Sequence, residues 1–246
     1  MIGAVPEARD PRDPVWDFTD ILLFFGLALP VFLVLFYIVL AALRIADVRA
    51  LGLRVLLPQF VGYLGALIPL YAIFKLKYGE SPMRLLRMGV TVREAAVSIS
   101  LGILTAFAVT ALAVLLRTPS ISMPMEDLLS DTASLIAAAI LGVTLGPAFE
   151  ELLFRGLLQP VLSRYTGVIL GIFLSALPFA MLHGPQYAWS WRHVLLITVA
   201  GVSFGVRRRL TNSTGAAAVM HAAYNAVLFA AFIAGRWAGP SLPRTF

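Results

Sequence analysis

Two adjacent glutamates and an arginine stand inside an apolar stretch of the chain, GPAFEELLFRG, over residues 146–156. Of the thirteen acidic residues in the sequence, only Glu150 and Glu151 fall within an apolar run. An ionisable group at membrane depth is costly unless it is paired or hydrated, and such groups usually serve a function. This stretch is therefore the first candidate for a functional site.

Helical spacing divides these three charges into two groups. Glu151 and Arg155 are four residues apart, so they share a helix face and are predicted to form an ion pair. Glu150 is rotated by about 100° from Glu151 around the helix axis, so it is free to face another helix. We expect the Glu151–Arg155 pair to be structural and Glu150 to be the chemically active member.

Two further apolar runs carry the other rare polar side chains. His221 and Asn225 are four residues apart and share a face, and Phe179 is placed in the same way beside His183. With a rise of about 1.5 Å per residue, Glu150 falls at the same depth as the two histidines and Asn225, within a layer roughly 10 Å thick. Three separate helices thus bring their polar groups to one level.

This set of side chains is suited to the activation of water. A glutamate in a partly dry cavity can act as a base near neutral pH, and a nearby histidine can hold the same water or carry its proton. A second histidine and an asparagine one turn on can donate two hydrogen bonds to an oxyanion. Alternatively, Glu150, His183 and His221 could hold Zn²⁺ with an open position for water. The chain has no H-E-x-x-H motif, and its sequence leaves both mechanisms open.

The elements that must position these residues belong to a membrane protein. The chain has 246 residues, of which 60% are hydrophobic and only 13% are charged, and its mean hydropathy is +0.89. A soluble domain usually carries about 25% charged residues. The predicted fold is therefore an all-α, polytopic helix bundle in the lipid bilayer, with about seven transmembrane helices and a range of six to eight. The seven predicted spans are 21–43, 55–74, 95–116, 134–162, 167–183, 194–206 and 212–233.

Charge and cysteine content exclude several classes of function. The net charge is +6, but the basic residues lie in short loops between apolar runs and form no stripe interleaved with aromatic residues, so nucleic acid is not expected as a partner. The absence of cysteine excludes a cysteine nucleophile and thiolate metal sites in this chain. The excess of Lys and Arg in alternate loops predicts a cytoplasmic N-terminus.

The sequence suggests four parts. Residues 1–20 mix both charges with three prolines and form a predicted polar tail. Residues 21–94 hold two accessory transmembrane helices and a basic linker, and residues 95–235 form the core that carries the polar layer. Residues 236–246 are a C-terminal tail.

Three motifs occur in order on successive apolar helices. EELLFR fits E-E-x-x-x-R, FAMLH fits F-x-x-x-H and HAAYN fits H-x-x-x-N. Together they resemble the CPBP family of intramembrane proteases, which includes the type II CAAX prenyl endopeptidases. The resemblance implies an intramembrane endopeptidase in which Glu150 and His183 activate water and in which His221 with Asn225 stabilises the oxyanion. Glu151 and Arg155 would be structural, and no cofactor is required, although zinc is possible.

The resemblance implies a multi-pass protein of the cell membrane, here a bacterial inner membrane, that acts on a membrane-associated peptide or protein. It leaves prenylated CAAX proteins, bacteriocin-type peptides and membrane-protein tails open as substrates. The alternatives are a non-catalytic scaffold or bacteriocin-immunity-type protein and, with less support, a proton- or cation-coupled transporter. No repeated pair of broken helices favours the transporter. GVSFG, residues 201–205, matches G-x-S-x-G, but that motif requires a strand-turn-helix, and Ser203 is predicted to be a packing residue in a helix.

Overall fold

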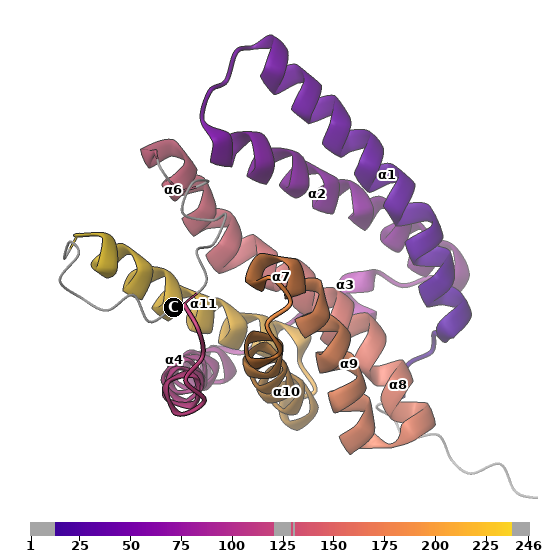
Figure 1. Ribbon diagram of the computed structural model, residues 1–246. Coiled ribbons are helices and arrows are strands. Elements are labelled where there is room, and N and C mark those ends of the chain that lie inside the picture. Colours follow the sequence, from indigo (N-terminus) through magenta and orange to yellow (C-terminus); the bar gives the residue numbers. More distant parts are fainter. Residues whose placement is uncertain (1–12, 121–128, 130, 238–246) are drawn as a thin grey trace, which may run out of the picture.

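The computed structural model describes residues 13–120, 129 and 131–237, and its described residues are helical, with no strand (Figure 1). This confirms the all-α prediction. The long helices are α1 (Phe18–Ile45), α2 (Leu51–Tyr78), α4 (Val92–Leu115), α9 (Val168–Leu182), α10 (Trp191–Thr211) and α11 (Thr214–Trp237). The segment between α4 and α9 contains α6 (Thr132–Ile140), η1 (Leu141–Leu145), α7 (Gly146–Glu151), η2 (Leu152–Leu158) and α8 (Gln159–Thr166). Two short helices, α3 (Pro82–Leu85) and η3 (Gly184–Tyr187), lie in connections.

Five helical segments are long and apolar enough to cross a membrane: α1, α2, α4, the continuous segment Thr132–Thr166 and residues Thr214–Gly235 of α11. With a rise of about 1.5 Å per residue, each exceeds the roughly 30 Å of a hydrocarbon core. The apolar helix α9 is shorter, and α10 has arginines in its last turn. The chain is therefore a multi-pass membrane protein, with five such spans among the described residues and two further helices packed between them.

Helices α1 and α2 form an antiparallel pair at one side of the bundle (Figure 1). Their contact with the rest of the protein is an apolar cluster that includes Phe24 of α1, Leu70 of α2 and Leu157 of η2. A second cluster joins α4, α10 and α11 through Ala106, Phe204 and Met220. The segment Thr132–Thr166 passes between these two groups of helices, and its Glu151 and Arg155 are buried among packed helices.

The segment predicted as one helix over residues 134–162 is interrupted by two π-type stretches, η1 and η2. Pro147 gives a physical reason for the first. Proline has no backbone N–H, so it cannot continue the helical hydrogen bonding at its position. Short π-type stretches inside α-helices are frequent at functional sites. Here they lie on either side of α7, the six-residue helix that ends with Glu150 and Glu151.

Several helices begin or end at other residues than the predicted spans, and the causes are local. Asp20, assigned to the N-terminal tail, lies in the first turn of α1, where it is buried and accepts hydrogen bonds from Lys77 and Tyr78. Part of the predicted linker is helical, because α2 continues to Tyr78 and α4 begins at Val92 behind a Thr91–Glu94 capping box. The predicted span 194–206 is the longer helix α10. Its apolar run is short because its last turns contain arginines.

One end of the bundle gathers the start of α1, the end of α2 and the turn between α8 and α9. Phe18 of α1 stacks on Tyr165 of α8 with ring centroids 5.3 Å apart. Gly167 alone joins α8 to α9, with a φ of +83° that favours glycine. The backbone N–H of Thr214, at the start of α11, donates to the carbonyl of Arg87. Several helices start or end at this level. Residues that are equally many positions away from these helix ends therefore lie at comparable depths in the bundle.

Candidate active site

Glu151 and Arg155 form the predicted i,i+4 ion pair in the interior of the protein. Glu151 Oε1 lies 3.2 Å from Arg155 Nη1, and neither side chain is exposed. A buried ion pair loses much of its attraction to the cost of removing both charges from water, so its neighbours must supply further hydrogen bonds. For Arg155 one such bond is present, because its Nη2 donates to the carbonyl of Gly201 on α10 at 2.7 Å.

Arg155 is also enclosed by aromatic rings and by a glycine of α10. Its guanidinium carbon lies 4.6 Å from the ring centroid of Phe179 and 5.7 Å from that of Phe204, within the range of a cation–π interaction. A Cβ atom at Gly201 would lie 2.9 Å from Arg155 Nη2. The close approach of α10 to η2 therefore depends on glycine at this position.

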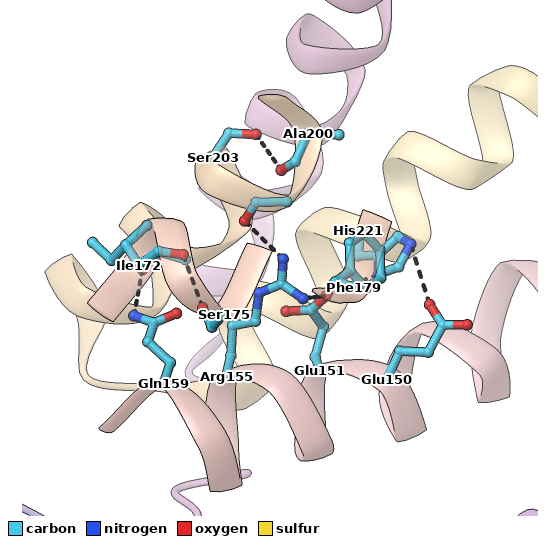
Figure 2. A network of polar contacts seen from close by, with 12 residues as sticks. Glu150, Glu151, Arg155, Gln159, Ile172, Ser175, Phe179, Ala200, Ser203 and His221 are labelled. Carbon is cyan, nitrogen blue, oxygen red and sulfur yellow. Dashed lines mark hydrogen bonds and ion pairs between the residues drawn. The ribbon is translucent and has the colours of Figure 1, made fainter. Parts of the chain in front are cut away.

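The ring of His221 lies between the carboxylates of the two consecutive glutamates (Figure 2). Its Nδ1 is 3.0 Å from Glu151 Oε1 and its Nε2 is 3.9 Å from Glu150 Oε2. Because an ionised carboxylate can only accept a hydrogen bond, Nδ1 carries the hydrogen. Phe204 stacks on the same ring with centroids 4.5 Å apart. Glu151 thus orients His221 so that its Nε2 faces Glu150.

Glu150 is the more accessible of the two glutamates. Its side chain is 25% exposed, whereas that of Glu151 is fully buried. The two carboxylates leave the helix in different directions (Figure 2), as their predicted rotation around the helix requires. Glu150 therefore combines a carboxylate that can meet water with a histidine nitrogen near by.

Asn225 is attached to the first π-type stretch. Its Nδ2 donates to the carbonyl of Gly142 at 2.8 Å. In the i,i+5 register this carbonyl would pair with the N–H of residue 147, which is a proline and has none. The amide of Asn225 thus supplies the missing donor. One of its two N–H bonds is used in this way, and the second is available for another acceptor.

His183 lies at the end of α9 and is connected to the cluster through Phe179. Its Nδ1 is 2.9 Å from the carbonyl of Phe179, so Nδ1 carries the hydrogen and Nε2 keeps a free electron pair in the neutral ring. The Phe179 ring centroid lies 4.8 Å from that of His183 and 5.6 Å from that of His221. Within residues 13–120, 129 and 131–237, no ion pair joins His183 to Glu150. One aromatic ring contacts both histidines.

The geometry bears on the zinc alternative as well. Three His, Asp or Glu side chains that could hold a metal ion together do not occur among the described residues. Glu150 and His221 approach each other, but His183 does not complete a ligand set with them. These residues therefore do not fit a three-ligand zinc site in this structure.

The structure adds residues that the three motifs do not contain. Gln159 donates to the carbonyl of Gly205 at 3.1 Å, one turn beyond the bond from Arg155 to Gly201. The sequence contained a signal for it, because Glu151, Arg155 and Gln159 recur every four residues. Tyr63 of α2 stacks on Phe149, the residue before Glu150. Nothing in the sequence linked α2 to this site.

The structure is a helical membrane bundle that contains a buried Glu–Arg pair, a histidine oriented by a carboxylate and a second, more accessible glutamate. Residues 132–227 match the family model of the type II CAAX prenyl endopeptidase Rce1-like proteins. This match over residues 132–227 supports a CAAX protease-like family, in agreement with the resemblance of the three motifs. No curated protein and no solved structure matches the chain. All the residues of the three motifs lie within the matched segment.

Proposed function

We propose that this protein is an intramembrane endopeptidase that hydrolyses a peptide bond of a membrane-associated protein or peptide by attack of activated water. The family match supports a protease-type enzyme in general. The observation that carries the proposal is the pairing of Glu150 Oε2 with His221 Nε2 at 3.9 Å, inside the matched domain. A carboxylate that is both partly accessible and next to a histidine is the arrangement that general-base catalysis uses.

In the proposed reaction Glu150 removes a proton from water, which then attacks the carbonyl carbon of the peptide. His183 assists by holding this water or carrying its proton, since its Nε2 has a free electron pair in the neutral ring. The proton passes to the amide nitrogen as the C–N bond breaks. The products are a new carboxylate and a new amine, and no covalent intermediate forms.

His221 and Asn225 are proposed to stabilise the oxyanion. Because Nδ1 of His221 donates to Glu151, its Nε2 can donate to an oxyanion only when the ring is an imidazolium. Asn225 contributes the amide hydrogen that does not bond to Gly142. Donors aimed at a developing oxyanion are commonly the largest contribution to such catalysis.

Cleavage of membrane-anchored peptides by the purified protein in detergent tests this function. Wild type is compared with Glu150→Ala, His183→Ala and a control, Glu80→Gln, which changes a partly exposed acid of the α2–α3 connection. We expect wild type and the control to cleave at least one peptide of the panel and the other two variants to lose cleavage. Equal cleavage by all four proteins would contradict the catalytic roles proposed for Glu150 and His183.

A second experiment separates catalysis from the scaffold or immunity-type alternative. The conservative variant Glu150→Gln keeps the size of the side chain but removes its ability to accept a proton. If the cellular phenotype of a deletion is restored by wild type and not by Glu150→Gln, the phenotype depends on catalysis. Full restoration by Glu150→Gln would favour a binding role, and proton or cation flux in proteoliposomes would favour the transporter.

A further inference from the structure

A cavity of about 140 Å³ lies where the segment before α1 meets α3, α8 and the end of α10. None of the residues proposed for catalysis lines it. Its walls include Asp13, Trp16, Leu85, Arg87, Pro160 and Arg208. Two guanidinium groups and one carboxylate therefore face the same space, so the walls carry a net positive charge. We call this space the arginine cavity.

Arg208 is a buried cation whose hydrogen-bond partners are neutral. It is only 6% exposed, and it donates from Nε to Thr214 Oγ1 at 2.9 Å and from Nη1 to Asn212 Oδ1 at 3.0 Å. A guanidinium has five N–H groups, so these two bonds leave three for an acceptor in the cavity. In the part of the chain that the structure describes, no carboxylate forms an ion pair with Arg208, that of Asp13 included. Because a buried charge is costly without an opposite charge, this arginine points to an anionic ligand.

Thr214, at the start of α11, holds Arg87 beside Arg208. Its backbone N–H donates to the carbonyl of Arg87 at 2.8 Å, while its hydroxyl oxygen accepts the bond from Arg208. Arg87 has a φ of +56°, in the left-handed region that favours glycine. A strained residue of this kind is a reason to look for a function, and here its side chain lines the cavity. Two like charges are thus fixed around one space, where an anion would reduce their repulsion.

We propose that the arginine cavity binds a phosphate group, carried by the headgroup of an anionic lipid or free as inorganic phosphate. Planar guanidinium groups bind phosphate oxygens through paired hydrogen bonds. The position of the cavity suits a lipid, because Trp16 in its wall lies two residues before Phe18, where the apolar helix α1 begins. Headgroups lie at the ends of membrane-spanning helices, and basic pockets between such helices bind them. The inference is independent of the proposed protease activity.

Thermal unfolding of the delipidated full chain in a neutral detergent tests the inference. Phosphatidic acid is compared with diacylglycerol, which has the same acyl chains and no phosphate, and sodium phosphate is compared with sodium chloride at equal ionic strength. A ligand that binds only the folded protein raises its unfolding temperature, so we expect phosphatidic acid at about 100 times its Kd to raise that of wild type by roughly 5 °C or more. Diacylglycerol should have no such effect. A rise with phosphatidic acid alone assigns the cavity to a lipid headgroup, and a rise with sodium phosphate as well shows that free phosphate is sufficient.

Three variants locate the binding. Arg208→Gln and Arg87→Gly should lose the rise, whereas the control Arg84→Gln should keep it, because Arg84 is an exposed arginine of α3 that bonds to Glu80 and does not line the cavity. Arg87→Gly removes a guanidinium at a backbone position that favours glycine, so the fold should tolerate it, and this variant decides the result if Arg208→Gln does not fold. An equal rise in wild type and Arg87→Gly overturns the inference, and so does a wild type that responds to neither phosphatidic acid nor sodium phosphate.

Discussion

Nδ1 of His221 lies 3.0 Å from Oε1 of Glu151, across 70 positions of the sequence. The same oxygen is 3.2 Å from Arg155 Nη1. Glu151 therefore serves two partners at once, one on its own helix and one on α11. This makes the orientation of His221 dependent on the buried ion pair, since a carboxylate held by Arg155 keeps the histidine ring turned with Nε2 toward Glu150.

The two glutamates are expected to differ when each is changed to glutamine. Glu151→Gln leaves the charge of Arg155 buried without its counter-ion, so we expect a loss of about 3–5 kcal/mol in the free energy of unfolding. Glu150→Gln changes a side chain that is 25% exposed, so the fold should keep its stability while cleavage is lost. Thermal unfolding in detergent, followed together with cleavage, measures both effects. A stable Glu151→Gln variant would contradict the structural role of the pair.

Asn225 is expected to matter more for the reaction than for the fold. Its bond to the Gly142 carbonyl is one neutral hydrogen bond, worth about 1 kcal/mol, whereas loss of one oxyanion donor lowers kcat by about 10²–10³-fold. Asn225→Ala should therefore cleave far more slowly and unfold at nearly the same temperature. Asn225→Asp should unfold more easily, because its carboxylate would face the carbonyl oxygen. Unchanged kcat in Asn225→Ala would remove this residue from the oxyanion pocket.

Gly201 is predicted to be intolerant of even one added methyl group. A Cβ at this position would lie 2.9 Å from Arg155 Nη2 and 3.1 Å from a ring carbon of Phe179. Overpacking of this kind costs about 1–3 kcal/mol, and here it also strains the bond from Arg155 to the Gly201 carbonyl. The matched control is Gly26→Ala on α1, where nothing lies within 4 Å. We expect Gly201→Ala to unfold at lower temperature and Gly26→Ala to be unaffected or slightly stabilised.

Chelation of metal ions is expected to leave cleavage intact. Glu150 and His221 come together, but His183 contacts Phe179 and does not join them in a three-ligand set. Activity measured before and after treatment with a strong chelator, with metal analysis of the same sample, checks this expectation. Loss of cleavage on chelation and its recovery with Zn²⁺ would contradict the metal-free mechanism and require His183 to move toward the two other residues.

The contact between Glu151 and Arg155 along one helix could be predicted from the sequence, whereas the common depth of all four polar groups stays a prediction. Glu151 and Arg155 are spaced for an ion pair, and the equal depth of Glu150 and His221 predicted their approach. The partner of Asn225 could not be predicted, because a backbone carbonyl carries no sequence signal. The two π-type stretches could not be predicted either, since a change of helical register leaves the apolar pattern of residues 134–162 almost unaltered.

Buried arginines explain why the predicted span 194–206 is shorter than helix α10. Arg207 donates to Ser98 and to the carbonyl of Glu94 on α4, and Arg208 donates to Thr214 on α11. These side chains continue the packed part of α10 beyond its apolar run, which ends at Val206. A count of apolar residues cannot include charged groups that are buried with partners on other helices. The Tyr63–Phe149 contact was missed for a related reason, because it joins two residues without any motif.

The membrane orientation is the last prediction, and the absence of cysteine in the chain makes it simple to test. The excess of basic residues predicts that the N-terminus and the α2–α3 connection are cytoplasmic, so the α1–α2 turn should face the other side. Single cysteines at Ala46 in the α1–α2 turn and at Met83 in α3, both exposed, report on these two sides of the membrane. In intact cells a membrane-impermeant maleimide should label Ala46→Cys and not Met83→Cys, whereas both should react after the membrane is opened. The reverse pattern would invert the predicted topology.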